Sequence, residues 1–510
     1  MKKTKKNSPL SMIISGILMI AIVFGAVSIF KGNDKDKAVT VSANEQKNTN
    51  AEVGIVANKD YVRIALDPFA GWNNLLGANG GLKTTVDSIN AKNGIYIEYV
   101  VKDPMEYASD LISGEVSGAG YTVNRYALLQ NKFDEAGVEV VVPYISNYSN
   151  GGDGIIASAD ILSVEDLVGK SIAVPRHSEA QTLVEWLIRN SSLTDQQIEQ
   201  IRNRIIYFES AEETGEAYFA SSVDAAATWE PYLTMAISST DSRILFDTSM
   251  ATNLILSGIV FRSDFVEQNE DFIVKFIDGA LQANSMYLKN FAALRQIDLF
   301  ALMTDEEILE MCQGASVTTW ADNMNLLSNN AVEMYKEMAN IWISVGEKAN
   351  PDKAVSAFTN KYVNQLAGKY PTNDVTSFSF TEEGRQAATQ ISNNAALLKN
   401  TLNIEFEVDS YKISKDSYAE INEFAKNAQI LNGVYIQIEG NTAKVQGDDG
   451  KDFSYKRALS VAKYLQALGL DPARFIIVGN GDTNPIATNE TEEGRAANRR
   501  TEVFFKVIGY

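Results

Sequence analysis

Short apolar runs alternate with amphipathic helical patterns from Tyr61 to about residue 250. The apolar runs are strand candidates, namely Tyr61–Leu66, Tyr96–Val101, Val138–Pro143, Ser171–Pro175, Ile205–Phe208, Val223–Trp229 and Ile244–Phe246. Between these runs the pattern predicts helices over residues 81–91, 104–114, 124–136, 178–190 and 211–220. Alternation of strands and helices predicts an α/β fold with mostly parallel sheets.

Helix starts are marked by the capping-box signature at Ser163 with Asp166, Thr194 with Gln197, and Thr304 with Glu307. After about residue 265 helical patterns dominate, and residues 272–281 repeat apolar positions every 3.6 residues. A break near residues 370–373 and a helix over about 381–399 then lead into a last region. That region predicts strand 404–408, helix 415–431, strand 434–439, helix 454–468, strand 474–478, helix 491–497 and strand 500–507.

The N-terminus carries lysines at positions 2, 3, 5 and 6 before an uncharged run from Leu10 to Phe30. About 20 residues at 1.5 Å each match a hydrocarbon layer about 30 Å thick, so the run predicts a transmembrane helix. The lysines keep their end cytoplasmic and place the rest of the chain outside. The alternative is a cleaved signal peptide with a site near Val41–Ala43. Residues 31–58 are polar and predict a flexible tether.

Composition excludes several classes of function. With 510 residues the chain is long enough for two or three domains. Its net charge of −20 argues against nucleic acid as a partner. A single cysteine, Cys312, permits no intramolecular disulfide, and a single histidine, His177, leaves little scope for an imidazole metal site. We therefore expect no metal and no cofactor.

Residues 59–370 resemble the nitrate/sulfonate/taurine-type substrate-binding proteins of ABC importers. The resemblance depends on phrases in the expected order: Asp153–Ala157, Ser163–Val174, His177–Ala180, Val223–Tyr232, Arg262–Phe265 and Tyr335–Trp342. It implies a two-lobed periplasmic-binding-protein fold of type II, with the ligand between the lobes. Lobe one would comprise roughly residues 60–150 and 250–370, and lobe two roughly 151–249. Gly151 and Gly152 would lie at a crossing between lobes, as a hinge or an ordinary turn.

Candidate ligand-binding residues follow strands or open helices, because α/β sheets bind ligands beyond the carboxyl ends of their strands. They are Gly71, Trp72 and Asn73, then Tyr121 and Thr122, then His177 and Ser178, and finally Trp229 and Glu230. Helix N-termini suit anions, whereas Glu230 suits a ligand ammonium, so we expect a small anionic or zwitterionic solute. Ser178 could instead be an N-cap, and Trp229 could be core packing.

An enzyme is the third possibility for this region. The same superfamily includes a thiamin-precursor synthase that consumes one of its own histidines and depends on a cysteine-rich motif. His177 is present, but the sole cysteine is Cys312, far along the chain. A single histidine at a helix start assembles no catalytic triad, so we expect no catalysis and no catalytic residues.

Residues 401–510 resemble the OmpA C-terminal domain, a small α+β domain that binds peptidoglycan through diaminopimelate. The matching phrases are Ile404–Phe406 with Ser410, Ile436–Thr442, Ser454–Leu465, Gly479–Gly481, Asn484–Ala487 and Gly494–Val503. The resemblance implies that Asn441, Thr442 and Arg457 bind peptidoglycan.

One position departs from the OmpA pattern. An aspartate that pairs with the ligand's amine in that family is Ala443 here. Arg457 remains, and its planar guanidinium can grip a carboxylate with two hydrogen bonds. Asp448, Asp449 or Asp452 could replace the lost carboxylate, or the site could recognise an altered wall peptide or act only as a scaffold.

The sequence thus predicts a single-pass protein of the cytoplasmic membrane, with its N-terminus inside and the bulk outside. Its predicted segments are 1–30 (cytoplasmic lysines and anchor), 31–58 (tether), 59–370 (solute-binding domain), 371–400 (connector) and 401–510 (wall-binding domain). Expected partners are a small-molecule solute, peptidoglycan and an ABC permease. The alternative is an envelope scaffold or sensor that links membrane and wall without transport.

Overall fold

The computed structural model describes residues 55–57, 59–239, 241–372, 379–402, 404–407, 410–444, 447 and 449–508. The predicted membrane segment Leu10–Phe30, the possible cleavage site and Asp448 lie outside these residues. No helix within the described ranges is long and apolar enough to span a bilayer.

Lobe one is built on a six-stranded sheet in the order β11-β4-β10-β3-β1-β2. Its strands are β1 Val62–Leu66, β2 Ile97–Val101, β3 Gly118–Thr122, β4 Val140–Ser149, β10 Leu256–Arg262 and β11 Ala315–Val317. Its first helices are α2 Asn73–Asn79, α3 Ile89–Lys92, α4 Tyr107–Ser113 and α5 Val123–Ala136. Later helices are α10 Ser263–Gln268, α11 Glu270–Ala283, α12 Asp305–Gln313, α13 Trp320–Asn325, α14 Ala331–Ser344, α15 Ala354–Ala357 and α16 Lys361–Asn364. The strands β1, β2 and β3 pair in parallel, as the alternating pattern predicts.

Lobe two is built on a five-stranded sheet in the order β7-β6-β8-β5-β9. Its strands are β5 Asp153–Ser158, β6 Ile172–Pro175, β7 Ile205–Phe208, β8 Ala225–Trp229 and β9 Ser242–Asp247. Its helices are α6 Glu179–Arg189, α7 Asp195–Arg202, α8 Ala211–Phe219 and α9 Tyr232–Ser239. The chain therefore passes between the sheets twice, from β4 to β5 and from β9 to β10.

The two crossings are joined by hydrogen bonds at Thr248. Its hydroxyl lies 2.7 Å from the Ser149 hydroxyl and accepts a bond from the Gly151 amide at 2.9 Å. Gly151 has φ +90°, a backbone conformation that residues other than glycine rarely adopt. A Cβ on Gly152 would meet the Gly314 carbonyl at 2.4 Å. Both glycines are therefore required by the backbone geometry of the crossing.

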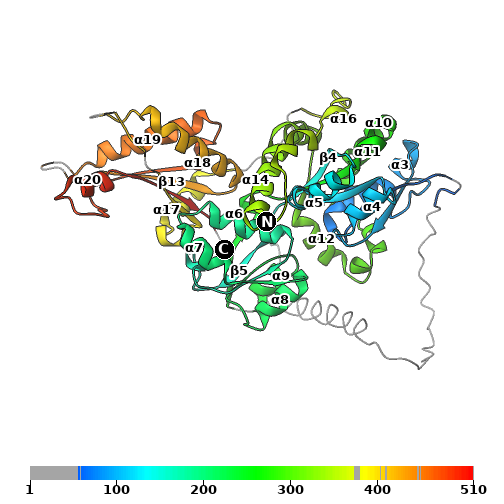
Figure 1. Ribbon diagram of the computed structural model, residues 1–510, viewed down its shortest axis with the longest axis horizontal. Coiled ribbons are helices and arrows are strands. Elements are labelled where there is room, and N and C mark those ends of the chain that lie inside the picture. The colour runs from blue at the N-terminus through cyan, green and yellow to red at the C-terminus, as the bar shows by residue number, and fades with distance from the viewer. Residues whose placement is uncertain are drawn as a thin grey trace, which may run out of the picture.

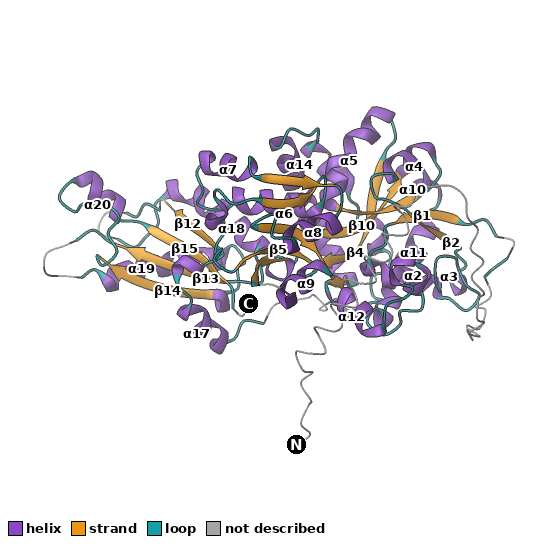
Figure 2. Cartoon of the chain, turned by 90° about the horizontal axis from the view of Figure 1, so that it is seen from below, coloured by secondary structure: helices purple, strands orange, loops and turns teal. Residues whose placement is uncertain are grey.

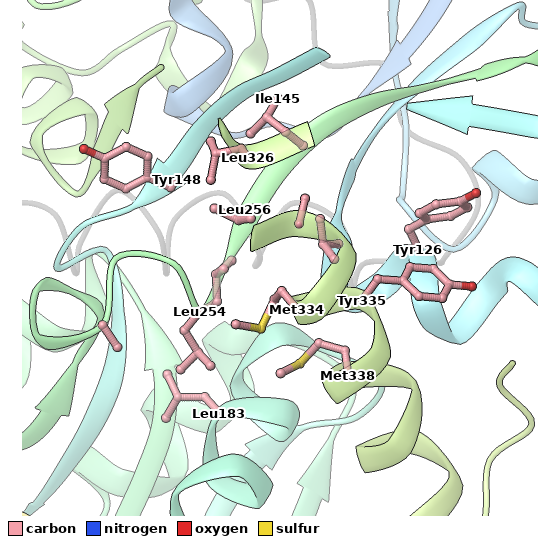
Figure 3. Packing of buried hydrophobic residues seen from close by; sticks show 14 of the residues in the cluster. Tyr126, Ile145, Tyr148, Leu183, Leu254, Leu256, Leu326, Met334, Tyr335 and Met338 are labelled. Atoms are coloured by element: carbon pink, nitrogen blue, oxygen red, sulfur yellow. The ribbon is translucent and has the colours of Figure 1, made fainter. Parts of the chain in front are cut away.

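The largest cluster of buried hydrophobic residues runs from one lobe into the other. Figure 3 shows Leu183 of α6, Leu254 of the second crossing, and Met334 and Met338 of α14 packed together. All four side chains are buried. Because α14 belongs to lobe one and α6 to lobe two, this packing joins the two lobes.

The C-terminal domain has a separate sheet in the order β12-β15-β13-β14. Its strands are β12 Leu398–Leu402, β13 Tyr435–Asn441, β14 Phe475–Gly481 and β15 Thr501–Lys506, and its helices are α17 Glu382–Gln390, α18 Tyr418–Ile430, α19 Lys451–Ala467 and α20 Glu492–Asn498. In Figure 1, α18 and α19 lie on one side of this sheet and α17 on the other. Figure 2 shows the strands of this domain, lobe two and lobe one following one another along the molecule.

The turn between α18 and β13 contacts the second crossing. Asn432 Nδ2 donates to Thr252 Oγ1 (2.9 Å), and Asn432 Oδ1 accepts from the Thr252 amide (3.1 Å). The Gly433 amide donates to the Met250 carbonyl at 3.0 Å. The buried Arg474 guanidinium donates to the carbonyls of Ala428, Leu431 and Val434, which fixes the shape of this turn.

Several sequence predictions are confirmed and several are wrong. The capping boxes at Thr194 and Thr304 are present, whereas Ser163 precedes only a short 3₁₀ turn. The helix expected over residues 81–91 is mostly irregular. The strand expected at 404–408 is also wrong, because β12, six residues earlier, pairs with β15 instead.

Candidate functional sites: an interlobe cleft and an arginine of the C-terminal domain

A cleft of about 660 Å³ lies between the two lobes. Lobe one contributes residues after β1 and β3, and lobe two contributes residues after β6 and β8. Its walls include the aromatic side chains of Phe69, Trp72, Tyr121, Trp229 and Tyr232. Pockets of about 300–1,000 Å³ with apolar walls and a few polar groups are typical of small-molecule sites.

Seven of the nine ligand candidates line this cleft, namely Trp72, Tyr121, Thr122, His177, Ser178, Trp229 and Glu230. Gly71 and Asn73 are not among its lining residues. The Gly71 carbonyl accepts a bond from Asn147, and Asn73 Nδ2 donates to the carbonyls of Tyr287 and Asn290. These two residues support the first helix of lobe one behind the cleft wall.

Two helices open at the cleft, one from each lobe. Thr122 caps α5 and Ser178 caps α6, each accepting a bond from the amide three residues on. The Ser178 hydroxyl also donates to the Pro175 carbonyl at 2.6 Å, so its one O–H donor is used within the protein. The N-cap interpretation of Ser178 therefore accounts for its contacts.

Glu179, the first residue of α6, reaches across to lobe one. Its Oε1 accepts from the Thr122 hydroxyl at 2.6 Å, and its Oε2 accepts from Arg125 at 2.8 Å. Only 10% of the Glu179 side chain and 13% of the Arg125 side chain are exposed. A charged pair thus closes the floor of the cleft between the N-termini of α5 and α6.

Of the other carboxylates that line the cleft, Asp67, Asp153 and Glu230 accept hydrogen bonds from neutral donors. Asp67 accepts from the Trp72 indole (2.7 Å), and Asp153 accepts from the Ser149 hydroxyl (2.6 Å). Glu230 accepts from the amide and hydroxyl of Thr234 (3.1 and 2.9 Å). Burial raises the pKa of all three carboxyls, that of Asp153 to about 7.

His177 contacts lobe one rather than the centre of the cleft. Its Nε2 lies 2.8 Å from Glu347 Oε1, and its ring meets Trp342 edge-on, with 6.2 Å between centroids. Cys312 lies in the core, and burial raises the pKa of its thiol to about 12. A protonated, buried thiol is not a nucleophile at neutral pH, so these two residues supply no reactive pair.

The sequence did not single out Asp67, Arg125, Asp153 or Glu179 as site residues. Asp67 directly follows β1 and Asp153 opens β5, positions that strand ends could have indicated. The pairing of Arg125 with Glu179 joins residues 54 apart in sequence, and no local pattern predicts it.

In the C-terminal domain, Arg457 projects from α19. Its guanidinium lies between the rings of Phe406 and Phe453, 4.6 and 4.5 Å from their centroids, and donates to the Ser410 carbonyl at 3.2 Å. Stacking between two rings holds the planar group in one orientation. Phe453 precedes Arg457 by one helical turn, which explains their contact.

The neighbouring turn holds the other predicted wall-binding residues. Asn441 is buried and bonds to Glu502 and Asn480 through its side chain, whereas the Thr442 hydroxyl has no partner among the described residues. Ala443 is 6% exposed. Asp449 and Asp452 form ion pairs with Lys451 and Lys456, respectively, so each already has a cationic neighbour.

Comparisons with known proteins match both parts of the chain. Residues 90–290 match the "NMT1/THI5 like" family model, and residues 405–499 match the "OmpA family" model. Outer membrane protein A of Bordetella avium is 35% identical over 105 residues, which cover 20% of this chain and 53% of that protein. Peptidoglycan-associated lipoprotein of Pseudomonas putida is 32% identical over 109 residues, covering 21% of this chain and 65% of that protein. The chain therefore spans only part of the length of these relatives.

Solved structures resemble the two-lobed part. The periplasmic aliphatic sulphonate binding protein SsuA of Escherichia coli has a TM-score of 0.47 at 17% identity, covering 60% of this chain and 99% of that one. The periplasmic nitrate-binding protein NrtA of Synechocystis PCC 6803 has a TM-score of 0.48 at 12% identity, covering 62% of this chain and 91% of that one.

Proposed function

We propose that this chain, which joins an NMT1/THI5-like domain to an OmpA-like domain, is an extracytoplasmic solute-binding protein that docks on peptidoglycan. The observation that supports solute binding best is the cleft, whose aromatic and charged lining comes from both lobes. Trp72 and Trp229 from opposite lobes would contact the solute together. No catalytic residues enter the proposal.

The proposal places the protein in the cell envelope. Leu10–Phe30 would be a single-pass anchor in the cytoplasmic membrane with its N-terminus inside, and Arg457 would hold a carboxylate of the wall peptide. N-terminal sequencing of protein from isolated membranes tests the anchor. Recovery of mature chains that begin near Asn44 would instead identify a cleaved signal.

A titration of the full-length chain tests solute binding. Compounds retained by the natively purified protein would be released by denaturation, identified by mass spectrometry and added back to the emptied protein. We expect the tryptophan fluorescence to change, and the variant Trp229→Ala to lose most of that affinity. Failure to find any compound that shifts the fluorescence or the melting temperature would contradict the proposal.

Transport through an ABC permease is the preferred role, and a sensor is the second candidate. The contact of Asn432 and Gly433 with Thr252 and Met250 favours the sensor, because it joins the wall-binding domain to a lobe crossing. Movement of the lobes about that crossing would be transmitted to the C-terminal domain through this contact. Solute uptake by cells with and without this chain separates the two roles, since only transport requires uptake to fall.

A further inference from the structure

One anion-binding feature of the cleft, the N-terminus of α5 with Arg125, is already used by the protein itself. An anionic ligand would need the free N-terminus of a helix and an unpaired cation. At the N-terminus of α5, however, the Thr122 hydroxyl and the Arg125 guanidinium both bind Glu179. A carboxylate of the chain thus occupies a helix N-terminus that would otherwise suit an anion.

The other basic groups of the cleft lining also have partners. Lys102 pairs with Asp110 at 2.8 Å, and His177 contacts Glu347 at 2.8 Å. Arg176 lies over the Tyr207 ring, 4.6 Å from its centroid. Among the described cations of the lining, Arg176 alone has no carboxylate partner, and the lining carboxylates outnumber the cations.

Three acidic groups of the cleft lining, by contrast, have hydrogen-bond partners that carry no charge. Asp67 and Asp153 are bonded to an indole and a hydroxyl, which are neutral, and Glu230 to a neutral amide and hydroxyl. The charge of Arg125 acts on Asp67, Asp153 and Glu179 together. One guanidinium against three carboxylates leaves two negative charges when all are ionised, and Glu230 adds a third.

The Tyr121 hydroxyl in the cleft wall has no hydrogen-bond partner among the described residues. Tyr121 is only 2% exposed. Buried hydroxyls normally have a partner, so this oxygen is available to an N–H donor of a ligand. The aromatic faces of Trp72 and Trp229 add a surface on which an organic cation is attracted.

We propose that the solute is a small organic cation with an apolar body, such as a primary amine, held between Asp67 of lobe one and Asp153 and Glu230 of lobe two. The proposal rests on the function proposed above, that the cleft binds a solute. Carboxylates of both lobes would then bind the same positive charge of the ligand, so ligand binding would favour the closed arrangement of the lobes. The ligand would replace solvent around the carboxylates and compensate their cost of burial.

Matched pairs of probes with the same body and opposite charge test this proposal on the full-length chain. They are benzylamine with benzenesulfonate and butylamine with butanesulfonate, and benzyl alcohol is the neutral reference. At pH 8 we expect both amines to raise the melting temperature at millimolar concentration, and the sulfonates and alcohol to leave it unchanged. Asp153→Asn and Glu230→Gln should each weaken amine binding at least tenfold.

The same variants separate a ligand-binding role from a structural one. A structural carboxylate stabilises the fold, so its loss lowers the melting temperature of the ligand-free protein. We expect Asp153→Asn to leave it equal or higher at pH 8, because an unpaired buried charge is removed. The control is Glu267→Gln, which also removes one negative charge but at an exposed position of α10. It should respond to amines like wild type.

Stabilisation by the sulfonates and not the amines would overturn the cation proposal and leave solute binding intact. Equal amine responses in wild type, Asp153→Asn and Glu230→Gln would overturn it as well. If neither pair acts and no compound co-purifies with the protein, both the cation proposal and the proposed solute-binding function fail.

Discussion

The interlobe cleft and the arginine site of the C-terminal domain differ in the sign of the charged side chains that predominate. In the cleft the Arg125 guanidinium acts on three carboxylates, Asp67, Asp153 and Glu179. In the C-terminal domain Arg457 is stacked between Phe406 and Phe453, and the family's acidic position is Ala443. The cleft therefore has carboxylates in excess of cations, whereas the wall site retains Arg457 and has Ala443 where the OmpA pattern has an aspartate.

This difference shows what a fold alone leaves undetermined. A two-lobed cleft and an OmpA-like turn each supply a place for a ligand, but single side chains set the ligand's charge. Glu179 illustrates the point, since one residue at the start of α6 occupies the anion-binding features of α5. Each site is best tested by changing the residue that sets its charge.

The largest expected effect is the pH dependence of stability that Asp153 contributes. Burial raises the pKa of this carboxyl to about 7, with Glu179 and Glu230 raising it further and Ser149 and Arg125 lowering it. The folded state then binds the proton more tightly than the unfolded state, whose carboxyl has an ordinary pKa of about 4. The contribution of Asp153 to the free energy of unfolding should fall as pH rises from about 4 to about 7, by at most about 4 kcal/mol, and stay constant above.

Urea denaturation of the ligand-free chain between pH 4 and pH 8 measures this contribution. The difference in free energy of unfolding between Asp153→Asn and wild type should shift in favour of the variant as pH rises. A difference independent of pH would show that Asp153 titrates normally in the folded protein and is solvated in the empty cleft.

The next effect concerns Glu179, whose replacement should change the charge preference of the cleft. Glu179→Gln leaves the Arg125 guanidinium buried without its ion-pair partner, which should cost about 3 kcal/mol of stability. Because the Thr122 hydroxyl and Arg125 become available together, millimolar butanesulfonate should restore part of that loss in the variant and none in wild type.

Chemical denaturation with and without butanesulfonate measures both parts of this prediction. Glu199→Gln is the matched control, because the ion pair of Glu199 with Arg202 has a carboxylate that is 59% exposed. It should change the stability by less than about 1 kcal/mol and gain no response to sulfonate. A Glu179→Gln protein as stable as wild type would mean that Glu179 does not neutralise Arg125.

At the wall site, Arg457→Ala should weaken binding to isolated sacculi by about 2 kcal/mol, roughly thirtyfold. The variant loses a planar donor that is held ready between two rings, together with its charge. Co-sedimentation of the full-length chain with sacculi measures the effect, and Lys456→Ala, one residue away on the outer face of α19, is the control. Equal sedimentation of wild type and Arg457→Ala would exclude a diaminopimelate-type site.

Local chemistry made much of the fold predictable. The strand β7 has the predicted bounds, and the capping boxes of Thr194 and Thr304 form because each needs only residues three positions apart. The missed strand β10 contains Ser257 and Gly258 and is defined by pairing with β3 and β4, which are distant in sequence. The edge strand β12 was missed for the same reason, since its partner β15 lies about a hundred residues later.

The candidate site was predicted less completely. Trp72, Trp229 and Glu230 were singled out because they lie at or after strand ends, and all three line the cleft, whereas their contact with a ligand stays a prediction. The charge of the site was not found, because it depends on whether Glu179 pairs with Arg125 across the lobes. Burial of Asp153, which sets its raised pKa, is likewise a property of the assembled cleft and not of neighbouring residues.

The smallest expected effect is a gain, from Ala443→Asp. The restored carboxylate would face the ligand's ammonium while Arg457 holds its carboxylate, so wall binding should strengthen. A charge-assisted hydrogen bond adds about 1.5–3 kcal/mol. Ala443 is only 6% exposed, so desolvation of the new carboxylate offsets part of this, and we expect a gain below about tenfold.

Sedimentation with sacculi, run beside Ala443→Asn, decides whether the gain comes from charge. The amide has the same shape but no charge, so it should leave binding near the wild-type level. The double variant Ala443→Asp, Arg457→Ala should lose most of the gain, because the two groups would hold opposite ends of one ligand residue. If Ala443→Asp binds no better than Ala443→Asn, then the wall ligand of this chain presents no ammonium at that position, and Arg457 grips a different part of the wall peptide from the one that the OmpA resemblance implies.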